Sequence, residues 1–204
     1  GAASGGNESF GRKLYKHLMN GVSHMLPFVV AGGIFIAIAF LIDSFSGYGN
    51  IANSPEQLAQ GLKPGDFGTV TEAAKWFMFI GKAAFGFMLP VLAGFIAMSI
   101  ADRPGLLVGF AGGTLASVGA TFASPAGDDT AVSGFLGALL AGFVAGWLLK
   151  LLEKSCDYLP TALNGIKPIL IYPLLGLGIV GVLMCAINPI MGEINGGLSD
   201  GIKW

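Results

Sequence analysis

The sequence predicts an all-α membrane protein, a polytopic bundle of about five transmembrane helices with its N-terminus in the cytoplasm. Composition is the first reason, because hydrophobic residues make up 53% of the 204 residues and charged residues only 11%. A soluble domain carries roughly 25% charged residues. The second reason is that the apolar residues gather in long runs, and the third is that basic residues fall in alternate connections. A soluble chain of this size could not bury so much apolar surface in one core, so lipid is its natural solvent.

Five apolar runs approach the ~20 residues that a helix needs to cross a bilayer. They cover residues 21–42, 76–100, 106–122, 134–152 and 169–187. Lys82 is the one charged residue inside them, apart from Lys150 at the end of the fourth. The turn 101–105 separates the second run from the third, so we expect a chain reversal there.

Small residues recur at every fourth position in the third and fourth runs, and the first of them, Gly105, directly precedes the third run. They are Gly105, Gly109, Gly113 and Ser117, followed by Gly134, Ala138, Gly142 and Gly146. Such small-xxx-small ridges let two helices approach closely in lipid. They predict a tightly packed bundle but identify no substrate.

The distribution of basic residues predicts the orientation. They lie before the first run (Arg12, Lys13, Lys16), in the turn 101–105 (Arg103) and in the connection 153–168 (Lys154, Lys167). The connection 123–133 has two aspartates and no basic residue. The positive-inside rule places the basic connections in the cytoplasm, and five crossings then leave the C-terminus outside. The long connection 43–75 fits less well, because Lys63 and Lys75 would lie outside.

The chain divides into three predicted parts. Residues 1–20 form a linker and a basic amphipathic flank, residues 21–187 the transmembrane bundle, and residues 188–204 a polar tail. A net charge of −1 gives no indication of nucleic-acid binding, and two cysteines give neither a disulfide framework nor a metal site. The sequence has no nucleotide-binding P-loop. We therefore expect no catalytic residue, no metal and no cofactor in this chain.

Four polar residues are candidates for function. A lysine at mid-membrane is costly, so Lys82 either contacts a substrate or, near the end of its run, extends its amine to the interface. Asn188 and Glu193 follow the fifth run and either enter a polar cavity or lie in a solvated loop. His24 is an interfacial histidine, more often structural than a proton relay. The predicted substrate contacts are Lys82, Asn188 and Glu193.

Four motifs carry a resemblance to a known family. They are GVSHMLPFVVAGG at 21–33, MLPVLAGFIAMSIADRPG at 88–105, GFLGALLAGFVAGW at 134–147 and GIKPILIYPLLG at 165–176. In this order they resemble the N-terminal half of the fructose-family membrane (IIC) component of the bacterial phosphoenolpyruvate-dependent sugar phosphotransferase system. The resemblance spans roughly residues 10–197.

The resemblance implies a permease of the bacterial inner membrane that takes up fructose or a fructose-like sugar and delivers it as its phosphate. It implies a cytoplasmic IIB component phosphorylated on cysteine as a partner, and a homodimer built on the first helices. The later part of the family, with its glutamate-bearing sugar-contacting hairpin, has no counterpart here. We therefore expect that this chain alone neither takes up nor phosphorylates fructose.

Two alternatives remain open at this point. One is a membrane scaffold or dimerisation fragment that does not transport and assembles with a missing half. The other is an unrelated membrane enzyme or channel, against which the four ordered motifs argue.

Overall fold

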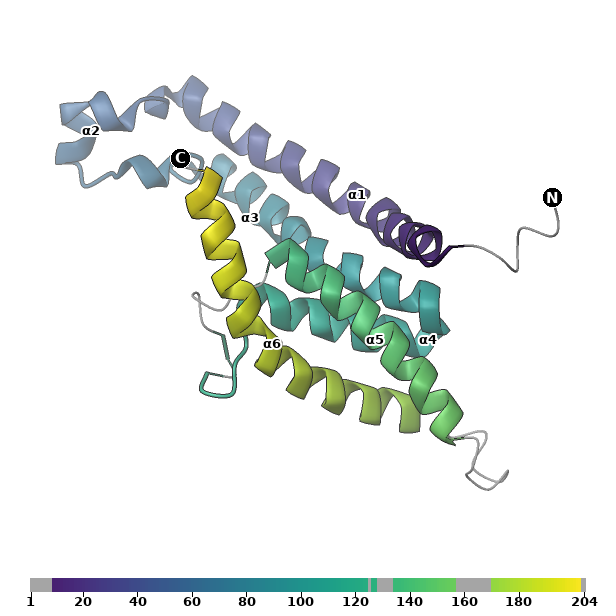
Figure 1. The fold of residues 1–204 in the computed structure, drawn as a ribbon. Coiled ribbons are helices and arrows are strands. Elements are labelled where there is room, and N and C mark those ends of the chain that lie inside the picture. The colour runs from purple at the N-terminus through teal and green to yellow at the C-terminus, as the bar shows by residue number, and fades with distance from the viewer. Residues whose placement is uncertain (1–8, 125, 128–133, 157–169, 203–204) are drawn as a thin grey trace. The chain divides into compact units, whose positions relative to one another are not determined.

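Helices account for all the regular structure in the part of the chain that the structure describes. The computed structural model describes residues 9–124, 126–127, 134–156 and 170–202, and these contain no β-strand. The α-helices are α1 (Phe10–Asp43), α2 (Pro55–Ala59), α3 (Glu72–Gly86), α4 (Met88–Val118), α5 (Gly134–Cys156) and α6 (Tyr172–Ile202), shown in Figure 1. The all-α prediction is confirmed.

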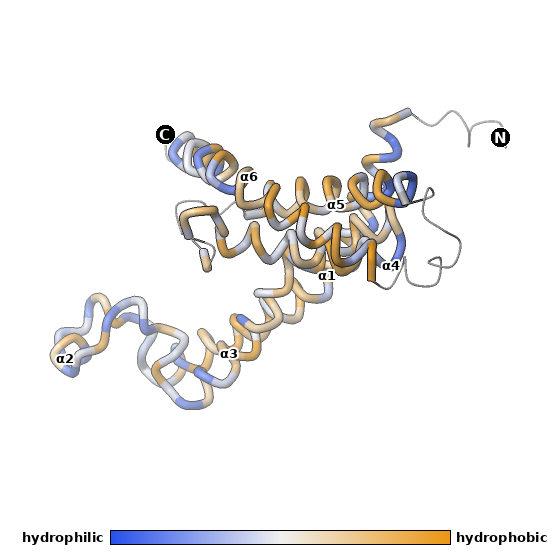
Figure 2. The backbone as a smooth tube through the Cα atoms, turned by 90° about the horizontal axis from the view of Figure 1, so that it is seen from below, coloured by the Kyte–Doolittle hydropathy of each residue, from blue (hydrophilic) through white to orange (hydrophobic). Residues whose placement is uncertain are grey.

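Four helical stretches are long and apolar enough to cross a membrane. They are Phe10–Asn53, Glu72–Val118, Gly134–Ser155 and Tyr172–Ile202. Figure 2 shows that hydrophobic residues dominate along these helices, whereas hydrophilic ones collect towards helix ends and connections. With no water in a bilayer core, a helix satisfies its backbone groups internally, so these stretches make a multi-pass membrane protein.

The second of these stretches contains a reversal of the chain. Inside α4, Ala101 (φ −128°, ψ 17°) and Asp102 (φ 61°, ψ −151°) leave the helical conformation. A Cβ added at Gly109 would lie 2.6 Å from the Ala93 carbonyl oxygen, and one at Gly113 would lie 2.8 Å from that of Leu89. The two halves of α4 therefore pack antiparallel. This confirms the predicted turn at 101–105 and explains how four helical stretches contain about five passes.

Contacts divide the chain into two compact units. The first comprises Gly1–Met25 and Leu89–Trp204, and the second comprises Leu26–Met88. Helix α1 begins in the first unit and continues into the second.

The first half of α4 forms the core of the first unit. Leu92, Ala93 and Ile96 are fully buried. Gly109 and Gly113 of the second half cover one side, and Gly142 of α5, whose added Cβ would lie 2.9 Å from the Ala93 oxygen, covers another. Both predicted small-residue ridges therefore contact this half-helix, which confirms close packing.

The second unit is built on a close crossing of α1 and α3. An added Cβ at Gly32 would lie 2.9 Å from the Gly81 carbonyl oxygen, and one at Gly81 would lie 2.8 Å from that of Gly32. Ala39, Ala74 and Met78 form a buried cluster next to this crossing. Small residues thus set the helix distance here as well.

A buried carboxylate closes the end of α1 in the second unit. Asp43 is fully buried and accepts hydrogen bonds from the backbone N–H groups of Gly68 (2.8 Å), Val70 (2.9 Å) and Thr71 (3.1 Å). The Thr71 hydroxyl also donates to it at 2.7 Å. Gly68 has φ +93°, and a Cβ there would lie 2.7 Å from Met78, so this position needs glycine. One side chain therefore holds the loop that leads into α3.

Helix α6 continues beyond the predicted end of the fifth run at residue 187. It runs to Ile202 with Pro189 inside it. Asn188 and Gly192 are buried, so the helix still packs on protein where we expected a polar tail to begin. The assignment of separate roles to residues 1–20, 21–187 and 188–204 stays a prediction.

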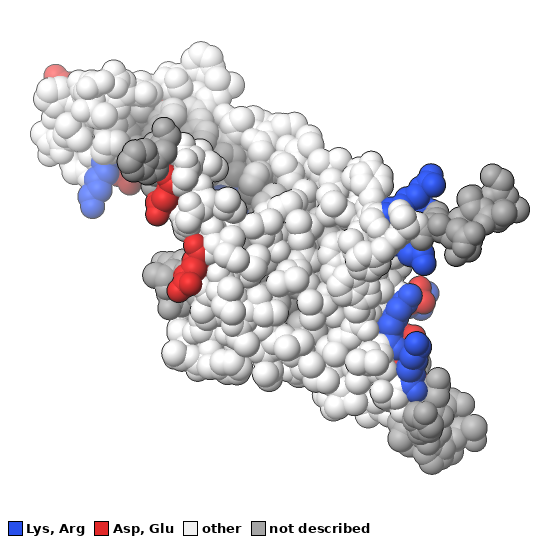
Figure 3. Space-filling model, viewed as in Figure 1, with Lys and Arg blue, Asp and Glu red and all other residues white. Residues whose placement is uncertain are grey.

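Basic side chains gather at one end of the first unit, as Figure 3 shows. Contacts connect the segments that carry them. His17 Nδ1 lies 2.6 Å from Ser99 Oγ, close to the turn of α4. Gly146, near the basic end of α5, packs against Ile100. The start of α1, the turn of α4 and the end of α5 therefore share one end, as the charge pattern required.

The cytoplasmic location of this basic end is testable by cysteine labelling. Single cysteines at Lys13 and Lys154 should be protected from an impermeant thiol reagent added outside intact cells. One at Asp128, which lies outside the described residues, should be labelled. The parent for these variants carries Cys156→Ser and Cys185→Ser. Labelling of Lys154→Cys with protection of Asp128→Cys would invert the orientation.

Candidate functional site

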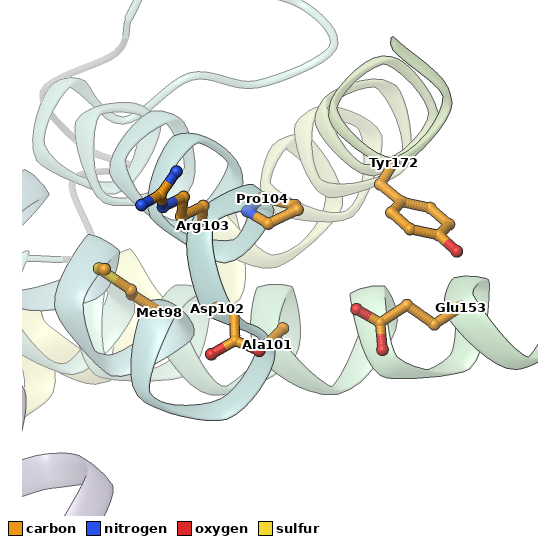
Figure 4. Close-up of a pocket in the computed structure, with 7 residues that line it drawn as sticks. All are labelled: Met98, Ala101, Asp102, Arg103, Pro104, Glu153 and Tyr172. Atoms are coloured by element: carbon orange, nitrogen blue, oxygen red, sulfur yellow. The ribbon is translucent and has the colours of Figure 1, made fainter. Parts of the chain in front are cut away.

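A pocket of about 460 Å³ opens at the basic end of the first unit. Its lining comes from three helices: Met98, Ala101, Asp102, Arg103 and Pro104 of α4, Glu153 of α5 and Tyr172 of α6 (Figure 4). The pocket therefore collects polar side chains that lie far apart in the sequence.

The turn of α4 positions two of the charged residues. Asp102 has a positive φ of 61°, a conformation that aspartate tolerates better than most residues. Pro104 follows in the first turn of the second half, where a helix does not need a backbone N–H donor. In Figure 4 the Arg103 side chain points away from the Asp102 and Glu153 carboxylates.

The chemistry of this pocket is hydrogen bonding. Two carboxylates accept hydrogen bonds, a phenol can donate or accept, and a guanidinium at the rim donates. Glu153 and Tyr172 are half-buried, whereas Asp102 and Arg103 are exposed. Such a set suits a hydroxylated molecule or a polar segment of a partner. Across the described residues, no group of three His, Cys, Asp or Glu side chains could hold a metal ion.

Asn188, a predicted substrate contact, is tied to the end of α4. It is fully buried, and its Nδ2 donates to the carbonyl oxygens of Leu115 (3.0 Å) and Ala120 (2.8 Å). The Leu115 carbonyl also accepts from the backbone N–H groups of Gly119 and Ala120. Asn188 therefore ties α6 to the segment where α4 ends. Its amide nitrogen therefore has a structural task.

The other two predicted contacts are exposed. Glu193 lies on α6 five residues after Asn188, on a different face of the helix, and Lys82 lies on α3 in the second unit. The structure does not bring Glu193 to the side of the helix that Asn188 buries. A role in sugar binding for Lys82, Asn188 and Glu193 stays a prediction.

His24 packs against α4. Its ring stacks on Phe95 with centroids 3.9 Å apart, and its Nδ1 lies 2.7 Å from the Asn20 carbonyl oxygen. The Asn20 amide in turn donates to the Phe95 carbonyl oxygen at 2.9 Å. These contacts favour the structural interpretation of this histidine.

Sequence reasoning did not single out Asp102, Glu153 or Tyr172 as site residues. The available signal was the pair of charges in the short turn between two apolar runs. Glu153 had no signal of its own, because its position beside the turn depends on how α5 packs.

Comparisons with known proteins give consistent matches. The family described as "Phosphotransferase system, EIIC" matches residues 19–204. A "PTS system fructose-specific EIIABC component" of Bacillus subtilis is 43% identical over 174 residues, which cover 85% of this chain and 23% of that protein. A "PTS system fructose-specific EIIC component" of Haloferax volcanii is 33% identical over 90% of this chain and 46% of its own length.

A third relative is the "Fructose-like PTS system EIIBC component" of Escherichia coli, 32% identical over 97% of this chain and 37% of that protein. The chain thus spans less than half the length of each of these curated relatives. No solved structure matches. With the apolar helices, these matches identify a multi-pass protein of the inner membrane.

Proposed function

Because this chain belongs to the EIIC family of the phosphotransferase system, we propose that it forms part of a sugar permease coupled to sugar phosphorylation. The main support for this function is the match to the family, which extends over residues 19–204. Relatives named for fructose or a fructose-like sugar support that substrate class. The match favours this function over a scaffold that does not transport.

The proposed partner is a phosphorylated IIB domain that meets the pocket at the basic end of the first unit, where Arg103 is part of the lining. Relatives named EIIABC and EIIBC support such a partner, since their names join B and C components. A phosphorylated domain is anionic at its reacting group, and Lys and Arg side chains attract phosphate. We also propose that the permease forms a homodimer, as the resemblance to the family implies.

The pocket beside Asp102, Glu153 and Tyr172 has a place in this scheme. It opens at the end that we expect in the cytoplasm, where sugar would leave for phosphorylation. Each buried polar group of a sugar needs a hydrogen-bond partner, and carboxylates and a phenol provide them. Lys82, Asn188 and Glu193 remain proposed contacts elsewhere in the chain.

A chimaera tests the proposed function. In the Bacillus subtilis relative, the matching stretch would be replaced by the corresponding residues of this chain. The chimaera would be expressed in a host that has no fructose uptake of its own. We expect the chimaera to take up labelled fructose and to accumulate fructose phosphate, because the exchanged segments share one fold and one role. This chain alone, reconstituted with phosphorylated IIB, should show neither activity.

The control is the same chimaera carrying Gly142→Leu, which should lose uptake because its helices cannot pack. Membrane immunoblots would establish the amount of inserted protein. A wild-type chimaera that inserts normally yet takes up no fructose would contradict the proposal.

A further inference from the structure

Basic and aromatic side chains of two helices form one surface at the basic end of the first unit. We define the basic-aromatic surface as Phe10, Arg12 and Lys13 of α1 with Trp147, Lys150 and Lys154 of α5. All six residues are exposed: Phe10 exposes 67% of its surface and Trp147 exposes 43%. Lipid tails explain exposed apolar residues along a membrane helix, but they do not explain cations among them.

Aromatic contacts join the two helices. The Phe10 and Trp147 rings stack with centroids 6.1 Å apart and an interplanar angle of 23°. Phe143 continues the line, with its ring centroid 5.5 Å from that of Trp147. The Phe10–Trp147 contact therefore places the basic start of α1 beside the second half of α5 in the first unit.

The charge at this end is strongly unbalanced. Among the described residues of the start of α1, the turn of α4 and the end of α5, basic side chains outnumber acidic ones. The basic residues are Arg12, Lys13, Lys16, Arg103, Lys150 and Lys154. The acidic residues are Asp102 and Glu153, and both line the pocket. The surface therefore carries a net positive charge.

We propose that the basic-aromatic surface binds the headgroups of anionic phospholipids. Lys and Arg pair with phosphate oxygens, and each basic residue near an anionic leaflet adds to the attraction. Tryptophan prefers the headgroup level, where one part of the ring is apolar and another is wet. An acidic protein would satisfy the cations, but it would leave the exposed ring edges of Phe10 and Trp147 in water. A phospholipid satisfies both, because its phosphate adjoins its acyl chains.

Lipid titration of the purified full chain in neutral detergent tests this proposal. Bound lipid would be counted by native mass spectrometry, with phosphatidylglycerol, phosphatidylcholine and inorganic phosphate as separate probes. We expect tighter binding of phosphatidylglycerol than of phosphatidylcholine, weakened by salt because the attraction is between charges. Lys13→Gln/Lys150→Gln should lower the affinity for phosphatidylglycerol by at least about tenfold.

Lys63→Gln/Lys75→Gln is the matched control, because it removes two exposed lysines of the second unit and should leave that affinity unchanged. Unchanged phosphatidylcholine binding would confirm that the variants are folded. The proposal would be overturned by equal affinities for the two lipids or by equal losses in both double variants. Competition by millimolar inorganic phosphate would also overturn it, because it would indicate a simple anion site. Independence from salt in the wild-type chain would contradict it as well.

Discussion

Gly142→Leu is expected to prevent stable folding of the first unit. A Cβ at this position would lie 2.9 Å from the Ala93 carbonyl oxygen and 2.9 Å from Ile96 Cβ. A backbone oxygen cannot rotate away, so α5 must separate from the core half of α4. Overpacking costs about 1–3 kcal/mol in ordinary cores, and we expect at least the upper end here. Thermal unfolding in detergent and yield of monodisperse protein would measure the loss.

Gly178→Leu is the matched control for this variant. It places the same side chain in α6, where an added Cβ would meet nothing within 4 Å. Its stability should stay close to that of the wild type, while Gly142→Ala should be intermediate. If Gly142→Leu and Gly178→Leu were equally stable, close packing of α5 on α4 would be wrong.

Asp43→Ala is expected to release the loop that precedes α3. The substitution leaves the N–H groups of Gly68, Val70 and Thr71 without the acceptor that now binds them. Each buried donor without a partner costs about 1–3 kcal/mol, so we expect a total loss of roughly 3–5 kcal/mol. Limited proteolysis should then cut between residues 60 and 71, and the melting temperature should fall.

Asp43→Asn should be less harmful, because its amide keeps one oxygen that can accept. Glu56→Gln, an exposed acidic residue of the same unit, should change neither the proteolysis pattern nor the melting temperature. Resistance of Asp43→Ala to proteolysis would mean that the loop is held by other contacts.

The sequence indicated the packing of the glycine ridges better than it indicated the contacts of the polar residues. The four-residue spacing of Gly105, Gly109 and Gly113 is visible along the chain, because side chains four apart share a helix face. The spacing predicted close contact correctly. It did not indicate that this ridge packs on the first half of the same helix, since the partner depends on how the chain turns at Asp102.

Asn188 makes a contact that the sequence did not indicate. Its role as a substrate contact stays a prediction. In the structure its amide donates hydrogen bonds to the carbonyl oxygens of Leu115 and Ala120. Those partners lie 73 and 68 positions away in the chain. No local pattern reports a pairing of that kind.

The sequence alone determined that this protein lies in a membrane and is helical. It also determined the turn at 101–105 and the family resemblance. These follow from composition, from apolar length and from spacing within one helix, which are all local properties of the chain. Tertiary structure alone decided that Asp43 holds a loop, that Asp102, Glu153 and Tyr172 share a pocket, and that Phe10 stacks on Trp147. The physical reason is that each of these depends on where separate helices meet, and the packing of the whole bundle sets those contacts.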